Sequence, residues 1–118
     1  MQGFFGQINL DSTKLDKNQF VNLINLSNSS KNKLSVYEED SCYFCYSNEC
    51  SFFVNDISKI KTAILLFGRL DNRSELLDKY KISKPSIKDE EIILWLYEYH
   101  GEKYFYDLIG AFSFIIFD

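Results

Sequence analysis

Three closely spaced cysteines are the first residues in this chain whose types and spacing point to chemistry. Cys42 and Cys45 form a Cys-x-x-Cys pair, and Cys50 follows shortly after. Thiolates at such spacing are typical of tetrahedral zinc sites, so a small cysteine-based zinc module is one hypothesis. A fourth ligand is hard to find, because the single histidine, His100, falls in a distant predicted element. We therefore expect small, reduced, mostly buried thiols and no metal site.

A dense polar turn is the second feature that could do chemistry. It directly follows a buried apolar run and consists of Arg69, Asp71, Asn72 and Arg73. Such a turn could form the rim of a binding site. We favour a structural role, in which these residues cap the following helix and form local ion pairs. Ser86 with Asp89 likewise resembles a short capping box, and an aspartate at a helix start is favoured by the helix dipole.

Length, composition and charge narrow the class of protein that could present these residues. A chain of 118 residues predicts one domain, and its 46% apolar residues are enough for a packed core. The net charge of −4 lacks the positive field that nucleic acid and anionic membranes require, so neither is an expected partner. No apolar run approaches the roughly 20 residues of a membrane span. The start does not resemble a signal peptide, so a cytoplasmic location is expected.

Hydrophobic periodicity predicts the elements that position the candidate residues. The order is strand, helix, several antiparallel strands, two or three helices and a final strand, which indicates an α+β fold. Trp95, Tyr104, Phe105 and Tyr106 are expected to be core or interface anchors. Strands are predicted at Gly3–Leu10, Leu34–Tyr37, Cys42–Tyr46, Ser51–Val54, Thr62–Phe67 and Ala111–Phe117, with the second to fourth forming a meander, and helices at Leu15–Leu26, Asp71–Tyr80, Lys88–His100 and Tyr104–Leu108.

Three segments resemble one enzyme family. Gly3–Gly6 is similar to the stretch after the nucleophile of class II glutamine amidotransferases. Gly68–Leu76 and Asp89–Asp118 resemble stretches of asparagine synthetases, β-lactam synthetases and lasso-peptide macrolactam synthetases. The resemblance implies that residues 1–118 form most of one amidotransferase type-2 domain, an αββα sandwich of the Ntn-hydrolase type. The final strand has no closing partner in the sequence, so we expect further strands from a longer parent or another chain.

The resemblance also implies which residues would split glutamine. The family uses an N-terminal cysteine as nucleophile and its free α-amine as base, but the matching position here is Gln2. At the oxyanion position stand Phe67 and Gly68, of which only the Gly68 N–H could donate. Asp89 matches the acidic residue that binds the substrate amine. The residues that resemblance marks as a vestigial substrate site are Gly68, Arg69, Asn72 and Asp89.

These observations lead to a catalytically degenerate glutaminase-type domain that acts as a scaffold or docking unit. Its expected partner is a synthetase domain, in cis or in trans, of an ATP-dependent enzyme that forms a peptide macrolactam or related amide. ATP and magnesium would be bound by that partner and not by this chain. Self-association through the final strand is also expected. The alternatives are an active amidohydrolase that uses Cys42 or Ser113 as nucleophile, and the zinc module.

Overall fold

The computed structural model describes residues 3–11, 13–16, 18, 19, 21, 22, 34–57 and 60–118. The chain divides into two compact units, residues 1–50 and 51–118. The described strands form two three-stranded sheets, and most of the described helical residues lie in the second half of the chain. The predicted α+β class is therefore confirmed.

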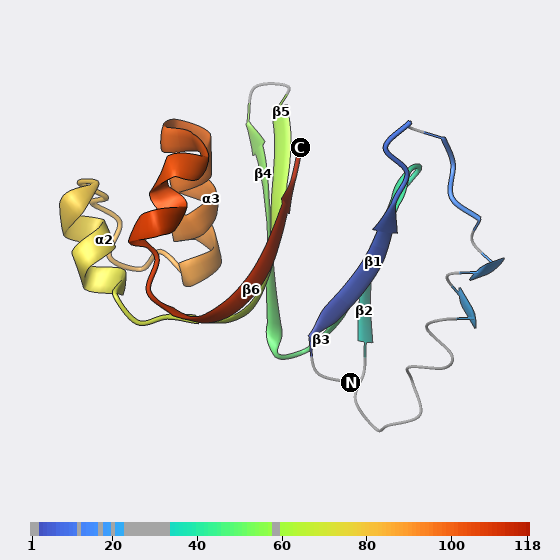
Figure 1. The fold of residues 1–118 in the computed structure, drawn as a ribbon, viewed down its shortest axis with the longest axis horizontal. Coiled ribbons are helices and arrows are strands. Elements are labelled where there is room, and N and C mark those ends of the chain that lie inside the picture. Colours follow the sequence, from blue (N-terminus) through green and yellow to red (C-terminus); the bar gives the residue numbers. More distant parts are fainter. Residues whose placement is uncertain (1–2, 12, 17, 20, 23–33, 58–59) are drawn as a thin grey trace. The chain divides into compact units, whose positions relative to one another are not determined.

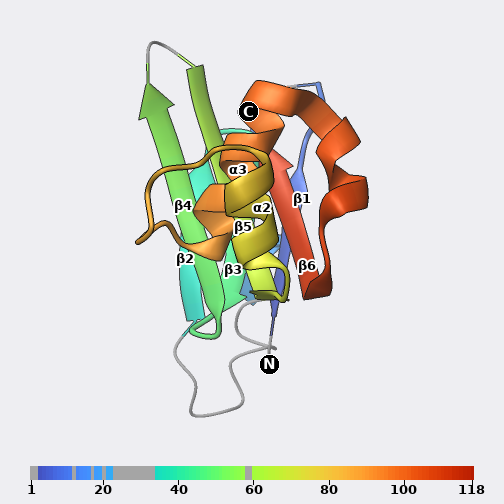
Figure 2. The same cartoon turned by 90° about the vertical axis from the view of Figure 1, so that its left-hand side faces the viewer.

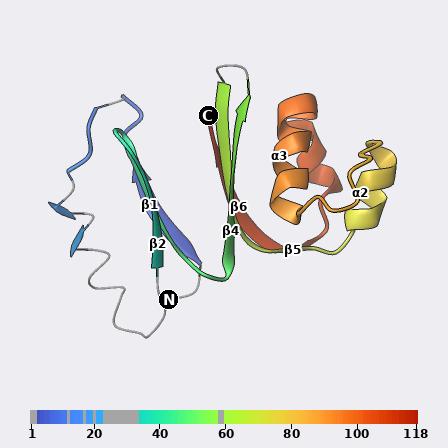
Figure 3. The same cartoon turned by 180° about the vertical axis from the view of Figure 1, so that it is seen from behind.

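The first unit contains a sheet in the order β1-β3-β2, with all pairs antiparallel. Figure 3 labels two of its strands, β1 and β2. Its strands are β1 (Phe4–Ile8), β2 (Leu34–Glu39) and β3 (Cys42–Ser47). The central strand, β3, has a neighbour on each side and is buried along almost its whole length. Leu15 packs against Tyr43 and Cys45 in a small core. Half of the helix predicted over Leu15–Leu26 lies outside the described residues, and of the other half Asn18, Gln19, Val21 and Asn22 are helical.

The second unit contains a sheet in the order β4-β5-β6 with helices packed on one of its faces (Figures 1 and 2). Its central strand, β5, carries the continuous apolar run, and Thr62 to Leu66 are buried as predicted. α3 lies over β5, where its apolar stripe faces the sheet. The elements are β4 (Cys50–Ile57), β5 (Ile60–Leu70), α2 (Arg73–Lys79), α3 (Asp89–His100), the 3-10 helix η1 (Gly101–Asp107) and β6 (Gly110–Phe117).

One hydrophobic core holds the second unit together. Trp95 is partly buried and packs against it, as expected of a core anchor. Of the predicted aromatic trio only Tyr104 enters the core, because Phe105 is 38% exposed and Tyr106 is 94% exposed. Burial raises the pKa of Tyr104, and within the described part of the chain its hydroxyl has no hydrogen-bond partner. The core residues are Ile64, Leu66, Leu70, Leu76, Ile87, Ile92, Ile93, Leu94, Leu96 and Tyr104.

The predicted three-strand meander is wrong in one respect. β2 and β3 do form an antiparallel hairpin, but β4 leaves that sheet and belongs to the second one. The place beside β3 is taken by β1, which comes from the start of the chain. Periodicity marks where strands are but not which strands pair, and β1 pairs with β3, which lies far along the chain. Within the described residues no helix is long and apolar enough to cross a membrane.

Candidate functional site

The candidate site begins where β5 and β6 bend together toward the helices (Figure 1). Gly68 has a φ of +114°, and a Cβ there would lie 2.0 Å from the carbonyl oxygen of Ala111. Gly110 on the facing strand is in the same situation, since its Cβ would lie 2.2 Å from the carbonyl oxygen of Arg69. The two strands can approach this closely only because neither position carries a side chain. The close backbone contact therefore gives Gly68 a structural role.

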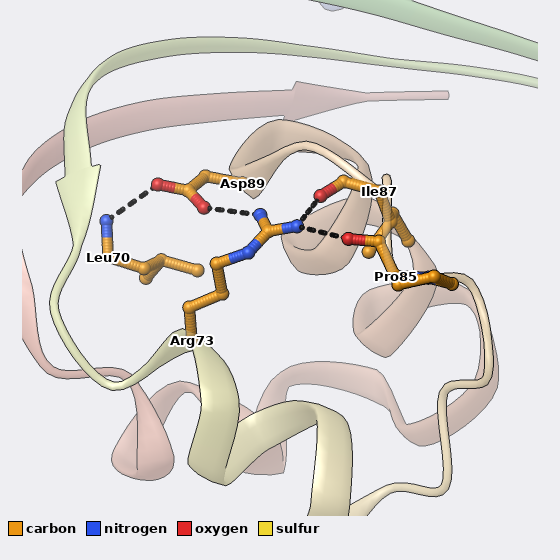
Figure 4. A network of polar contacts seen from close by, with 5 residues as sticks. All are labelled: Leu70, Arg73, Pro85, Ile87 and Asp89. Atoms are coloured by element: carbon orange, nitrogen blue, oxygen red, sulfur yellow. Dashed lines mark hydrogen bonds and ion pairs between the residues drawn. The ribbon is translucent and has the colours of Figure 1, made fainter.

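Asp89 lies at the centre of a polar network, shown in Figure 4. Its carboxylate accepts a hydrogen bond from the Leu70 N–H at 3.0 Å and another from the Arg73 guanidinium at 3.0 Å. Arg73 also donates to the carbonyl oxygens of Ile87 and, at 3.4 Å, of Pro85. We call Leu70, Arg73, Pro85, Ile87 and Asp89 the Arg73–Asp89 corner. It ties the end of β5 and the start of α2 to the loop before α3 and to the first residue of α3.

The predicted capping box at the start of α3 is wrong. The residue at the cap position is Lys88, and no side chain caps the helix by a hydrogen bond. Asp89 instead reaches back to Leu70 and Arg73, 19 and 16 residues earlier in the chain. A carboxylate in the first helical turn still suits the helix dipole. Its hydrogen bonds, however, are made to residues that are distant in the sequence.

Asn72 forms a second long-range tie. Its side-chain amide donates to the carbonyl oxygen of Asp107 at 2.7 Å and accepts from the Ile109 N–H at 3.0 Å. The backbone N–H of Asp71 adds a bond to the Ile109 carbonyl at 2.7 Å. Asn72 occupies the cap position of α2 but makes no side-chain cap bond, so the predicted capping role is wrong. The NH2 group and the carbonyl oxygen of this amide therefore both bind the segment that leads into β6.

Arg69 and Asp71 form the local ion pair that the sequence predicts. Their nearest atoms, Nε and Oδ1, are 3.0 Å apart, and the two side chains are 73% and 50% exposed. The predicted site residues thus fall into two groups. Gly68, Asn72 and Asp89 are engaged in tertiary structure, whereas Arg69 is at the surface. Gln2 lies outside the described residues.

No protein-family model and no curated protein matches this chain. The role of the site therefore rests on its geometry.

Asp107 is the centre of a polar cluster that the sequence did not indicate. Its carboxylate accepts hydrogen bonds from Lys79 at 2.8 Å and from the Tyr80 hydroxyl. The bond from Lys79, followed by that from Tyr80, holds the pKa of Asp107 below its ordinary value of 3.8. The pKa of Lys79 is raised by the same contact. The lysine–tyrosine pair at the end of α2 was the available signal, but its partner lies 28 residues further along the chain.

Two of the three cysteines, Cys45 and Cys50, lie where a thiolate is disfavoured. Cys42 and Cys45 are buried in β3, as expected, and Cys50 is half-buried. Burial raises the pKa of the Cys45 and Cys50 thiols, which favours the neutral form. The Ser47 hydroxyl lies 3.9 Å from the Cys50 sulfur and accepts a hydrogen bond from the Gly3 N–H at 3.1 Å. In the described part of the chain no group of three or more His, Cys, Asp or Glu side chains is placed to hold a metal ion.

The other nucleophile considered, Ser113, is on β6 opposite Phe67 and is exposed. His100, the single histidine available as a base, packs its ring against Tyr80 and Trp95, with centroids 4.8 and 5.7 Å away. A nucleophile needs an oriented base within hydrogen-bond reach, about 2.6–3.2 Å. No hydrogen bond joins His100 to Ser113 or to a cysteine in the described residues, so this geometry gives no support to the amidohydrolase alternative.

Proposed function

We propose that this chain is a catalytically degenerate glutaminase-type domain that serves as a scaffold or docking unit. It would belong to an asparagine-synthetase-like, ATP-dependent enzyme that forms a peptide macrolactam or a related amide. The proposal includes a specific architecture for the α+β fold, namely an αββα sandwich of the Ntn-hydrolase type. Two three-stranded sheets and helices packed on the second of them are compatible with that architecture.

The observation that carries the proposal is that the polar residues of the family-like motif bind the protein itself. Asp89, which would hold the amine of glutamine, is occupied by Leu70 and Arg73. Asn72 uses both its donor and its acceptor on backbone groups. A ligand would have to displace charge-assisted hydrogen bonds, which are among the strongest in proteins. These side chains are therefore engaged in the fold, and Asp89 already has a cationic partner, Arg73, where the amine of glutamine would bind.

The residues that would perform the chemistry support the same conclusion. Gln2 has no nucleophile comparable to a thiolate, and Phe67 has no side-chain donor for an oxyanion. The sequence also lacks the S-G-G-x-D-S pyrophosphate loop of synthetase domains. Adenylation and amide formation would therefore belong to a partner domain that binds ATP and magnesium.

Strand β6 is the proposed docking element. In the described sheet it pairs with β5 on one side, and its sequence from Gly110 to Phe117 contains no charged residue. Sheet edges without charges or proline are templates for pairing with another strand. The partner strand would come from the synthetase domain, and a second copy of this chain is the competing occupant.

The first experiment measures ammonia release from L-glutamine by the purified chain. We expect no release above buffer, because both the nucleophile and the side-chain oxyanion donor are missing. A Gln2→Cys variant with Met1 removed is the matched comparison. It should remain at least about 100-fold less active than a glutaminase with a complete oxyanion hole. Ammonia production by the unaltered chain would refute catalytic degeneracy.

The second experiment measures binding to a synthetase domain encoded beside this gene, by titration calorimetry and sedimentation. We expect a stoichiometric complex that is weakened by Ser113→Lys, because Ser113 is exposed on β6 and a lysine on an edge strand disfavours pairing with another strand. Glu75→Lys, on the exposed surface of α2, makes a larger change in net charge and should leave binding unchanged. A chain that forms only homodimers, or a complex insensitive to Ser113→Lys, would exclude docking of a synthetase on β6.

A further inference from the structure

A groove in the second unit lies between β4, the loop that precedes α3, and α3 itself. It has a volume of about 230 Å³. Pockets that take drug-sized ligands or large cofactors measure about 300–1,000 Å³, so this one suits a single side chain or a small cation. It is lined by Phe53, Asn55, Lys84, Ile87, Glu91, Leu94, Trp95 and Glu98.

Two features of the sequence build the groove. On α3 the lining residues recur at helical spacing, which places them on one face, and they are Glu91, Leu94, Trp95 and Glu98. The opposing loop is held by the Arg73–Asp89 corner, because Arg73 donates to the carbonyls of Pro85 and Ile87. Tyr99 packs against the Trp95 ring with centroids 4.6 Å apart, which limits the movement of the indole. The groove is therefore preformed.

The charges in the groove are not balanced. Lys84 pairs with Glu91 at 3.2 Å, so these two groups neutralise each other. The Glu98 carboxylate accepts hydrogen bonds from the Asn55 amide at 3.0 and 2.9 Å and from the Thr62 hydroxyl. These donors are neutral, and no cation of the described residues lies within ion-pair distance of Glu98. Glu98 is exposed, so water also solvates its carboxylate, but the hydrogen bonds hold that carboxylate in place and it has no cationic partner among the described residues.

An oriented carboxylate beside an indole ring fits a particular class of ligand. The indole face attracts a cation, and the carboxylate has roughly four acceptor positions, of which Asn55 and Thr62 use three. Phe53 and Leu94 add apolar surface on which an alkyl stem can pack. A guanidinium suits this arrangement better than an ammonium, because it is planar, stacks on aromatic rings and is less strongly hydrated.

We propose that this groove binds an alkylguanidinium group, with its cation between Trp95 and Glu98 and its stem against Phe53 and Leu94. The group could be free arginine or an arginine residue of a partner protein, since both present the same chemistry. The inference does not depend on the proposed function. It rests on residues of the second unit alone and would survive a positive glutaminase assay.

The chain contains one tryptophan, so the intrinsic fluorescence at 295 nm excitation reports directly on Trp95. The protein is titrated at constant ionic strength with L-arginine and with Nα-acetyl-arginine amide. L-citrulline, which has nearly the same shape without the charge, is the ligand control. We expect a saturable fluorescence change with at least one arginine compound and none with citrulline. Preference for the free amino acid would identify a small-molecule ligand, and preference for the amide would identify a peptide-borne arginine.

The matched variants are Glu98→Gln and Glu75→Gln, which make the same change of charge inside and outside the groove. Glu98→Gln should weaken arginine binding about tenfold or more, as expected for loss of a charge-assisted hydrogen bond, while Glu75→Gln should leave it unchanged. The proposal is overturned if neither arginine compound gives a saturable change, if citrulline binds equally well, or if folded Glu98→Gln binds like the unaltered chain. The comparison of arginine with citrulline needs no variant, so it decides the question even if Glu98→Gln does not fold.

Discussion

Two arginine–aspartate pairs stand in the same short region of this chain and have the same nitrogen–oxygen distance of 3.0 Å. Arg69 and Asp71 are two residues apart and largely exposed. Arg73 and Asp89 are 16 residues apart, and their side chains are only 33% and 22% exposed. The second pair also bonds the backbone at Leu70, Pro85 and Ile87. The equal contact distance therefore does not distinguish the two pairs. We expect burial and the number of further partners to decide how much each pair contributes to the free energy of unfolding.

The largest effect is expected at the strand contact that precedes both pairs. Gly68→Ala puts a Cβ against the backbone of β6 and forces an unfavourable positive φ. We expect a loss of about 3 kcal/mol or more in the free energy of unfolding, or failure to fold. Urea unfolding followed by circular dichroism measures this. Ser113→Ala, on the facing strand, is the control and should change stability little. Unaltered stability in Gly68→Ala would contradict the close approach of the strands.

The second-largest effect is expected at the Arg73–Asp89 corner. Asp89→Asn keeps the shape but removes the charge that faces Arg73, and we expect a loss of about 2 kcal/mol in unfolding free energy. Urea unfolding is the measurement. A double-mutant cycle with Arg73→Met should give a coupling energy of about 1 kcal/mol or more. Additive single effects would show that the pair does not act as a unit.

Asn72→Ala removes both side-chain bonds to the segment before β6. We expect a loss of about 1–3 kcal/mol in the free energy of unfolding, since each of the two bonds contributes about 0.5–1.5 kcal/mol. Hydrogen exchange adds a local readout, because the Ile109 amide should exchange faster in the variant. Ser74→Ala, on the exposed side of α2, is the control. Equal protection of Ile109 in Asn72→Ala and in the unaltered chain would count against this tie.

The Asp107 cluster predicts a dependence on pH. Because the folded-state pKa of Asp107 is depressed, its contribution to stability is present above the ordinary value of 3.8 and is lost as pH falls through the folded value. Asp107→Asn should therefore lower stability at pH 7 and change it less at pH 2.5. Thermal unfolding at both pH values checks the sign. A variant with the same deficit at both would show that the carboxylate is not the group responsible.

The smallest effect is expected at the exposed pair. Asp71→Asn makes the same chemical change as Asp89→Asn, but we expect no more than about 0.5 kcal/mol because solvent and salt screen the exposed charges. Unfolding at low and at high salt separates the screened part. Comparable losses in the two asparagine variants would remove the distinction between the pairs.

The sequence predicted most elements and few of their partners. α3 was predicted to within one residue of its start because its apolar stripe is strong. The buried part of β5 was predicted at Thr62–Phe67 because its apolar run is continuous, but the strand extends from Ile60 to Leu70. The bonds of Asp89 and Asn72 could not be predicted, because their partners lie 16 to 37 residues away and depend on strand and helix placement. The groove was not predicted from the sequence, although the four lining residues on α3 are spaced so that they share one face of a helix. The spacing of residues along one helix gives no information about the residues on the other side of a groove.

The contact between β5 and β6 has a consequence for how this sequence can vary. Backbone atoms of the facing strand occupy the space where a Cβ of Gly68 or Gly110 would stand. The nearest of these atoms are the carbonyl oxygens of Ala111 and Arg69. A larger residue at either position cannot be relieved by trimming its neighbour, because a peptide group cannot be made smaller. Second-site suppressors of a change at Gly68 should therefore be absent from the facing strand, and any that arise should act by stabilising the domain elsewhere.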